Sequence, residues 1–170
     1  MKPKPIERAQ IDMFHECLEL DRATGRVFWK VKIAKKVVVG SEAGGKNNLG
    51  YRRVNLFGAP YLTHRIVFAM VHGYCPDEVD HINGDPSDNR PENLRPATRS
   101  QQNMNRAKQN NNTSGHKGVY WFKPGKYWAS RIKVGGRYVC LGYFRDIEQA
   151  AAAYQAGAEK YHGEYQRGVA

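Results

Sequence analysis

The chain has 170 residues, enough for one ordinary domain or two small ones, and a hydrophobic share of 41% excludes wholesale disorder. Lys and Arg number 27 against 16 Asp and Glu, which gives a formal net charge of +11. A basic excess of this size favours a phosphate-rich partner.

The sequence does not suggest a membrane or secreted protein. No run approaches 18 apolar residues, and the opening "MKPKPIERAQ" does not resemble a signal peptide. We therefore expect a cytoplasmic protein. Cys17, Cys75 and Cys140 form no CxxC pair, so they are predicted to be buried or partly buried thiols without disulfides. Any metal would then be bound by oxygen and imidazole ligands.

In chain order, the first predicted element is a helix over residues 7–20, stopped by the turn "DRATG". Glycine-bearing turns then separate three predicted strands, over 26–32, 35–40 and 51–57. A helix is expected from Thr63, which can cap it, to about Gly73.

The run "TRSQQNMNRAK" predicts a short helix capped by Thr98, and the polar stretch over 108–115 predicts a linker. Strands are predicted within "HKGVYWF", "YWASRIKV" and "RYVCLGYF", with a Gly-Gly hairpin before the third. A helix from the cap Asp146 to Tyr161 follows. The second domain, 116–170, should therefore be a three-stranded antiparallel sheet packed on one helix.

Period-two alternation sorts the side chains of this sheet into two faces. The helix is expected to cover Val119, Trp121, Ile132 and Leu141. The opposite face would carry Tyr120, Phe122, Arg131, Lys133 and Tyr138. Cations interleaved with aromatic rings favour nucleic-acid binding. The alternative is that the charges only keep a small sheet soluble.

The stretch "VDHINGDPSDNRPENL" has the chemistry of phosphodiester hydrolysis. Asp80 is a hard oxygen ligand suited to Mg²⁺ or Mn²⁺, and His81 can take a proton from water. Asn93 can donate and accept hydrogen bonds at once and so hold the loop in shape. Taken singly, such residues are ordinary turn material. His64 and His72 are interpreted as packing or capping residues.

The segment "THRIVFAMVHGYCPDEVDHINGDPSDNRPENLRPATRSQQN" resembles the HNH endonuclease motif of the phage homing-endonuclease type, over about residues 63–105. The resemblance implies a ββα-metal site with His81 as general base, Asp80 as metal ligand and Asn93 as the bracing Asn. The family's second metal-binding Asn falls at Gln102. Either Gln102 or Asn103 would then complete the site.

The segment "GHKGVYWFKPGKYWASRIKVGGRYVCLGYFRDIEQAAAAYQAGAEKYHG" resembles the plant ethylene-response-factor (Apetala-two) DNA-binding domain. That family docks its sheet in the major groove of DNA, which agrees with the face predicted from the alternation. The expected DNA-binding residues are Lys117, Tyr120, Phe122, Arg131, Lys133, Arg137 and Tyr138.

The sequence thus predicts an α+β protein: an HNH domain over 1–107 with preceding β-hairpins, a linker, and a DNA-binding domain. The expected function is metal-dependent hydrolysis of phosphodiester bonds in double-stranded DNA, by a phage or mobile-element enzyme of homing type. No protein partner is evident, so a monomer or weak dimer is expected. The alternative is a non-catalytic DNA-binding regulator, which Gln102 keeps open; an RNA-binding module is less favoured.

Overall fold

The computed structural model describes residues 5–106, 108 and 111–166. The chain divides into two compact units, Met1–Arg99 and Ser100–Ala170. Helices and small antiparallel sheets occur in both, which confirms the expected α+β class. No helix among the described residues is long and apolar enough to cross a membrane.

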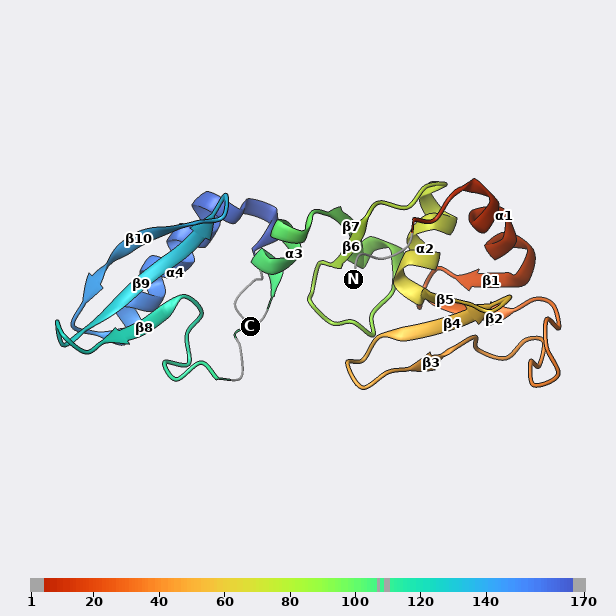
Figure 1. Cartoon of the computed structure of the whole chain (residues 1–170), viewed down its shortest axis with the longest axis horizontal. Helices are drawn as coiled ribbons and strands as arrows, with labels where there is room; N and C mark the ends of the chain where they lie inside the picture. Colours follow the sequence, from red (N-terminus) through yellow and green to blue (C-terminus); the bar gives the residue numbers. More distant parts are fainter. Residues whose placement is uncertain (1–4, 107, 109–110, 167–170) are drawn as a thin grey trace. The chain divides into compact units, whose positions relative to one another are not determined.

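The first unit combines two helices with three small antiparallel sheets, whose strand orders are β1-β2, β3-β4-β5 and β6-β7 (Figure 1). A short 3₁₀ helix, Pro91–Asn93, precedes β7. The elements are α1 (Arg8–Cys17), β1 (Leu18–Asp21), β2 (Arg26–Trp29), β3 (Gly45–Lys46), β4 (Arg52–Leu56), β5 (Ala59–Leu62), α2 (Thr63–His72), β6 (Glu78–His81) and β7 (Leu94–Ala97).

Helix α2 is the centre of this unit. It is buried continuously from Thr63 to Met70, because α1, β4 and β5 pack around it. A helix that is apolar on most sides is stable only when it is enclosed in this way. The core has Phe14, Leu18, Leu56, Ile66 and Phe68 among its most buried side chains. Val79 of β6 and Leu94 of β7 belong to this core, which therefore holds the two strands against α2.

Three of the predicted elements in this unit are wrong in extent or type. The strand predicted over 26–32 ends at Trp29. The first helix ends at Cys17 rather than residue 20, because Leu18–Asp21 pairs with β2 instead. The predicted strand over 35–40 is a loop in which Val38 and Val39 are 66% and 55% exposed. In the part of the chain that the structure describes, no strand covers these two side chains, so their packing does not stabilise an extended conformation.

The start of α2 and the strand before it also differ from expectation. The segment after Leu56 continues the sheet as β5, between the predicted strand over 51–57 and the predicted helix. The N-cap of α2 is Leu62, and Thr63 is its first helical residue. Thr63 therefore belongs to the first turn of the helix, where its side chain is buried, and it is not the cap.

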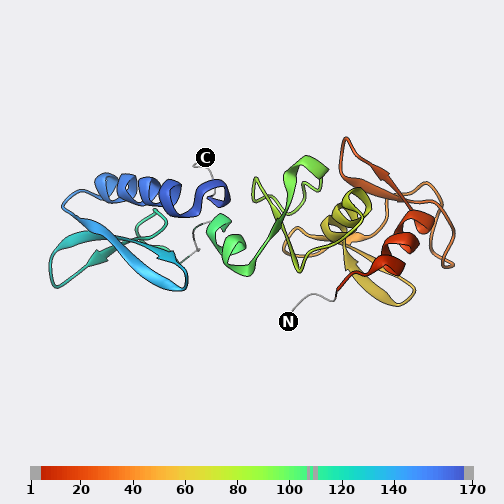
Figure 2. The same ribbon diagram turned by 90° about the horizontal axis from the view of Figure 1, so that it is seen from above.

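The second unit contains the predicted sheet and helix. The sheet has the order β10-β9-β8, and the helix α4 lies along one face of it (Figure 2). Asp146 caps α4 as expected, its carboxylate accepting a hydrogen bond from the Glu148 N–H at 2.9 Å. The elements are α3 (Arg99–Asn105), which begins at the boundary between the units, β8 (Val119–Phe122), β9 (Tyr127–Val134), β10 (Arg137–Phe144), α4 (Ile147–His162) and a 3₁₀ turn, Gly163–Tyr165.

The prediction of which side chains α4 covers is correct for Val119 and Ile132 and wrong for Trp121. Val119 packs on Ala150 and Ala151 of α4, and Ile132 is buried. Trp121, in contrast, is 43% exposed and packs edge-on against Trp128, because the helix covers only the start of the edge strand β8. A register shift between Cys140 and Gly142 also places a bulge in β10.

The three cysteines are free thiols, as expected. Cys17 is buried and Cys75 half-buried, but Cys140 is exposed, contrary to the prediction. Its partner across the sheet is Arg131, so it belongs to the face that α4 does not cover. The division between the units falls before Ser100, whereas the predicted linker over 108–115 lies after α3 and includes positions outside the described residues.

Candidate active site and nucleic-acid interface

The Asp80-His81 pair ends strand β6, which is paired with β7 in the first unit. In this antiparallel pair Asp80 lies opposite Arg95 and His81 opposite Leu94. Successive side chains of a strand point to opposite sides, so the carboxylate and the imidazole are presented in different directions. Both side chains are largely buried. The short hairpin therefore holds them in fixed positions.

Asn93 ties the loop between β6 and β7 together. Its Oδ1 accepts a hydrogen bond from the Asn83 N–H at 3.0 Å. Its Nδ2 donates to Asn83 Oδ1 at 3.0 Å and to the carbonyl oxygen of Asp88 at 2.7 Å. A buried amide with three such bonds resists reorientation. This geometry agrees with the bracing expected of Asn93; its importance for activity stays a prediction.

The imidazole of His81 is surrounded by polar and aromatic groups. Its Nε2 lies 3.0 Å from Asn89 Oδ1, and its ring centre is 4.9 Å from that of His64 and 6.0 Å from that of Tyr51. Burial lowers the pKa of His81, and the hydrogen bond with Asn89 partly opposes that shift. The neutral imidazole that results is the form a general base requires.

His64 is buried beneath this ring, in agreement with the packing role expected for it. Its ring also lies against Tyr51, with centroids 5.5 Å apart. Burial, together with the nearby His81 and Arg65, lowers the pKa of His64 to about 3. His64 is thus a neutral aromatic spacer at the site. His72, likewise expected to pack, lies against Phe68 with ring centroids 4.3 Å apart and the rings tilted by 32°.

Asp80 forms a buried ion pair that the sequence reading missed. Arg95 donates from Nε and Nη2 to Asp80 Oδ2 at 3.1 and 2.9 Å. The two side chains are only 11% and 10% exposed, respectively. Pairing the segment 78–81 with 94–97 would have identified Arg95, because that register places it directly opposite Asp80.

One side chain at this hairpin, Asp80, is of the kind that binds a hard divalent cation. Mg²⁺ is commonly held by one or two carboxylates, with water and substrate phosphate completing its coordination. Asp80 can supply one carboxylate oxygen. No group of three His, Cys, Asp or Glu side chains able to hold a metal occurs among the described residues. Gln102 and Asn103 lie on α3, in the second unit, and their ligation stays a prediction.

Replacing His64 with phenylalanine should flatten the pH dependence of stability between pH 6.5 and 4. In the folded protein the lowered pKa keeps His64 neutral, whereas in the unfolded chain His64 takes up a proton as the pH falls below 6.5. Protonation therefore stabilises the unfolded state, and the free energy of unfolding falls with pH below 6.5. His64→Phe should reduce that loss by about 1.4 kcal/mol per pH unit. Urea unfolding at pH 7.5, 6 and 5 measures it. An unchanged slope would show that His64 does not titrate on unfolding.

The face of the second unit's sheet that α4 leaves uncovered is rich in cations and rings, and we call it the outer face. The Arg131 guanidinium lies 4.7 Å from the ring centre of Tyr120 and 4.2 Å from that of Tyr138. Lys133 Nζ lies 5.8 Å from the same Tyr138 ring. None of the residues of β8, β9 and β10 is acidic. The outer face therefore presents positive charge without a competing carboxylate from its own strands.

The structure adds two rings to this face that the sequence reading did not include. Tyr127 stacks on Phe122 with centroids 5.2 Å apart, and Tyr143 lies 4.9 Å from Tyr127. Tyr143 joins the outer face because of the bulge in β10, which pairs it with Ala129. The alternation of a regular strand does not predict that placement.

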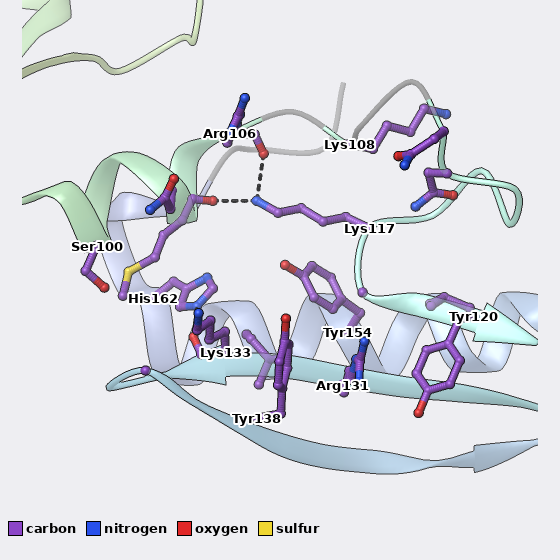
Figure 3. A pocket seen from close by; sticks show the side chains of 18 of the residues that line it. Ser100, Arg106, Lys108, Lys117, Tyr120, Arg131, Lys133, Tyr138, Tyr154 and His162 are labelled. Atoms are coloured by element: carbon purple, nitrogen blue, oxygen red, sulfur yellow. Dashed lines mark hydrogen bonds between the residues drawn. The ribbon is translucent and has the colours of Figure 1, made fainter. Parts of the chain in front are cut away.

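A cleft of about 820 Å³ opens beside the outer face, within the second unit (Figure 3). The described residues that line it include Arg106, Lys108, Lys117, Arg131 and Lys133. No Asp or Glu is among the described lining residues. The ammonium of Lys117 donates to the carbonyl oxygens of Met104 and Arg106 at 2.6 and 2.7 Å. Lys117 therefore stabilises the end of α3, a role that its sequence position did not indicate.

Residues 61–104 match the family model described as HNH endonuclease. The chain is also similar to Protein 3.8 of Escherichia phage T7: the two are 29% identical over 106 residues, which cover 61% of this chain and 87% of that protein. No solved structure matches. The segment that includes Asp80, His81 and Asn93 is thus similar to the HNH endonuclease family, and the chain has a distant relative in a phage.

Proposed function

We propose that this protein is a metal-dependent endonuclease that hydrolyses phosphodiester bonds in double-stranded DNA. The observation that carries the proposal is the position of Asp80, His81 and Asn93 on one braced hairpin inside the segment matched by the HNH endonuclease model. A phage or mobile-element enzyme of homing type, acting in the cytoplasm of a bacterial host, is the specific form we favour.

The residues of the hairpin divide the chemistry between them. A divalent cation, Mg²⁺ or Mn²⁺, would neutralise charge that develops on the phosphate and the leaving oxygen. Asp80 would contribute an oxygen ligand, and Gln102 or Asn103 is the further ligand proposed from the sequence. His81 would accept the proton of the attacking water, and Asn93 would hold its loop. The resemblance to HNH enzymes implies 5′-phosphate and 3′-hydroxyl ends.

The outer face is the proposed docking surface for duplex DNA. Arg131 and Lys133 supply charge for the phosphates, and the rings of Tyr120, Phe122 and Tyr138 supply flat surfaces for sugars and bases. Arg137, the first residue of β10, would extend the basic surface. Lys117 would contribute at its edge, in addition to its bonds with the end of α3.

The test is cleavage of supercoiled plasmid DNA with Mg²⁺, with Mn²⁺ and with EDTA, ideally including DNA from phage hosts. Nicking or linearisation that requires the metal is the expected result. The rival function is a DNA-binding regulator with a degenerate site, favoured by Gln102 and by the Arg95 bonds that already engage Asp80. Tight, salt-sensitive binding without cutting under any of these conditions would support the regulator.

Substituting Arg131 or Lys133 with methionine should weaken DNA binding and reduce its salt dependence. Each phosphate contact removed lowers the slope of log K against log salt by about 0.9. Fluorescence anisotropy with a labelled duplex between 50 and 300 mM salt measures the slope. Lys160→Met, on the exposed side of α4, is the matched control and should leave the slope unchanged. Equal slopes in all variants would exclude the outer face as the docking surface.

A further inference from the structure

Asn89 lies in the loop between β6 and β7, in a run whose composition is that of an ordinary turn. The structure gives it a different environment: its side chain is buried, and its Oδ1 lies 3.0 Å from His81 Nε2. Asn93, four residues later, makes its bonds to Asn83 and to the Asp88 carbonyl and none to the imidazole. The two asparagines therefore have separate partners.

The contact with Asn89 decides which imidazole nitrogen keeps its lone pair. An amide oxygen only accepts hydrogen bonds, so in this arrangement the neutral His81 ring carries its proton on Nε2. Its Nδ1 is then the nitrogen with a lone pair. The partner of one ring nitrogen commonly sets the state of the other in this way.

The same contact limits rotation of the ring. His64 lies edge-on to His81, with an interplanar angle of 69°, and Tyr51 is tilted against it at 57°. With two rings beside it and one nitrogen bonded to Asn89, the imidazole has little freedom to turn. A base held in one orientation avoids the cost of ordering it during the reaction.

Asn89 is itself held by a turn far away in the sequence. Gly25, in the hairpin turn between β1 and β2, has φ +68°, and a Cβ built on it would lie 2.2 Å from the carbonyl carbon of Asn89. It would also lie 2.3 Å from the Asn89 carbonyl oxygen and from the Arg90 nitrogen. These are backbone atoms, so a side chain at position 25 would displace the loop. The turn thus packs directly against the backbone that carries Asn89.

We propose that Asn89 is a positioning residue that fixes His81 with its proton on Nε2 and its Nδ1 toward the attacking water, and that the turn at Gly25 holds Asn89 in place. This proposal rests on the nuclease function proposed above for His81. It adds to that function the two residues that orient the base, neither of which touches the substrate.

The first test compares Asn89→Leu and Asn89→Asp in the plasmid assay. Leucine has a similar volume but accepts no hydrogen bond, and should lower kcat by about 10²-fold with KM unchanged. Aspartate offers an oxygen to the same N–H and should recover most of that loss. Equal activity of wild type and Asn89→Leu would overturn the proposal, as would equal loss in both variants.

The second test reads the tautomer directly and needs no catalysis. In ¹H–¹⁵N correlation spectra of the full chain at neutral pH, His81 should show its proton on Nε2, and Asn89→Leu should shift it toward a mixture of both tautomers. A wild-type spectrum with the proton on Nδ1 would overturn the proposal. If the wild type cuts no DNA, the nuclease function fails, while this spectrum still decides the role of Asn89.

The third test addresses the turn with a matched pair of glycines. Gly25 and Gly58 both have positive φ, +68° and +79°, but a Cβ at Gly58 would meet nothing within 4 Å. Both alanine substitutions strain the backbone, and only Gly25→Ala displaces the loop. Gly25→Ala should lower kcat by about tenfold more than Gly58→Ala does. Equal kcat values for the two variants would remove Gly25 from the proposal.

Discussion

Replacing His81 with alanine is expected to lower metal-dependent cleavage of duplex DNA by about 10²–10⁴-fold, the usual contribution of a positioned general base. His81 is the group on the braced hairpin that can accept a proton near neutral pH, and burial lowers its pKa so that the neutral form is present. Single-turnover cleavage measures the chemical step without product release.

The control for this variant is His72→Ala, which lies in the same matched segment but is exposed and contacts Phe68. It should cut at close to the wild-type rate. Anisotropy should show that His81→Ala binds DNA as tightly as wild type, since its outer face is intact. A His81→Ala protein that cuts as fast as wild type would refute the catalytic assignment, even if cleavage requires metal.

Replacing Arg95 with methionine is expected to lower the free energy of unfolding by about 3–5 kcal/mol, as removal of one partner from a buried ion pair does. The variant removes the Arg95 guanidinium from beside the largely buried Asp80 carboxylate. Urea unfolding in EDTA measures the loss without any contribution from bound metal. The double variant Asp80→Asn with Arg95→Met should recover part of it, because the negative charge that Arg95 neutralises is then absent too.

Arg99→Met is the matched comparison for the Arg95 variant. Arg99 also forms an ion pair, with Glu78 at 3.4 Å, but its side chain is 75% exposed. An exposed pair contributes little, so this variant should change stability by less than about 1 kcal/mol. If Arg95→Met were no more destabilising than Arg99→Met, the buried pair would not support the hairpin.

The sequence predicted best those features that depend on neighbouring residues along the chain. Strands β9 and β10 lie where alternation placed them, and Asp146 caps α4. Asp80, His81 and Asn93 were identified because their residue types and spacing lie within one loop. Each of these signals is local, so the fold around it does not alter it.

What the sequence did not predict depends on pairing and packing between distant segments. Strand register brings Arg95 to Asp80, and the buried helix α2 brings His64 to His81. Asn89 reaches His81 through the folded loop, which packs against the turn at Gly25. The run over 35–40 has strand-forming residues, but it forms a loop in which Val38 and Val39 are exposed. Lys117, expected to contact DNA, is engaged with the end of α3, which no periodicity indicates.

The guanidinium of Arg131, held between Tyr120 and Tyr138, has a thermodynamic consequence for recognition. An arginine that is free in solution loses about 0.5–1.5 kcal/mol of conformational freedom when a partner immobilises it. Here the unbound protein has already restricted the side chain, so most of that loss occurs during folding. Association with the proposed DNA partner would therefore be fast, because Arg131 needs little rearrangement. Discrimination among DNA sequences would depend on which of them fit a guanidinium that is already held in one position.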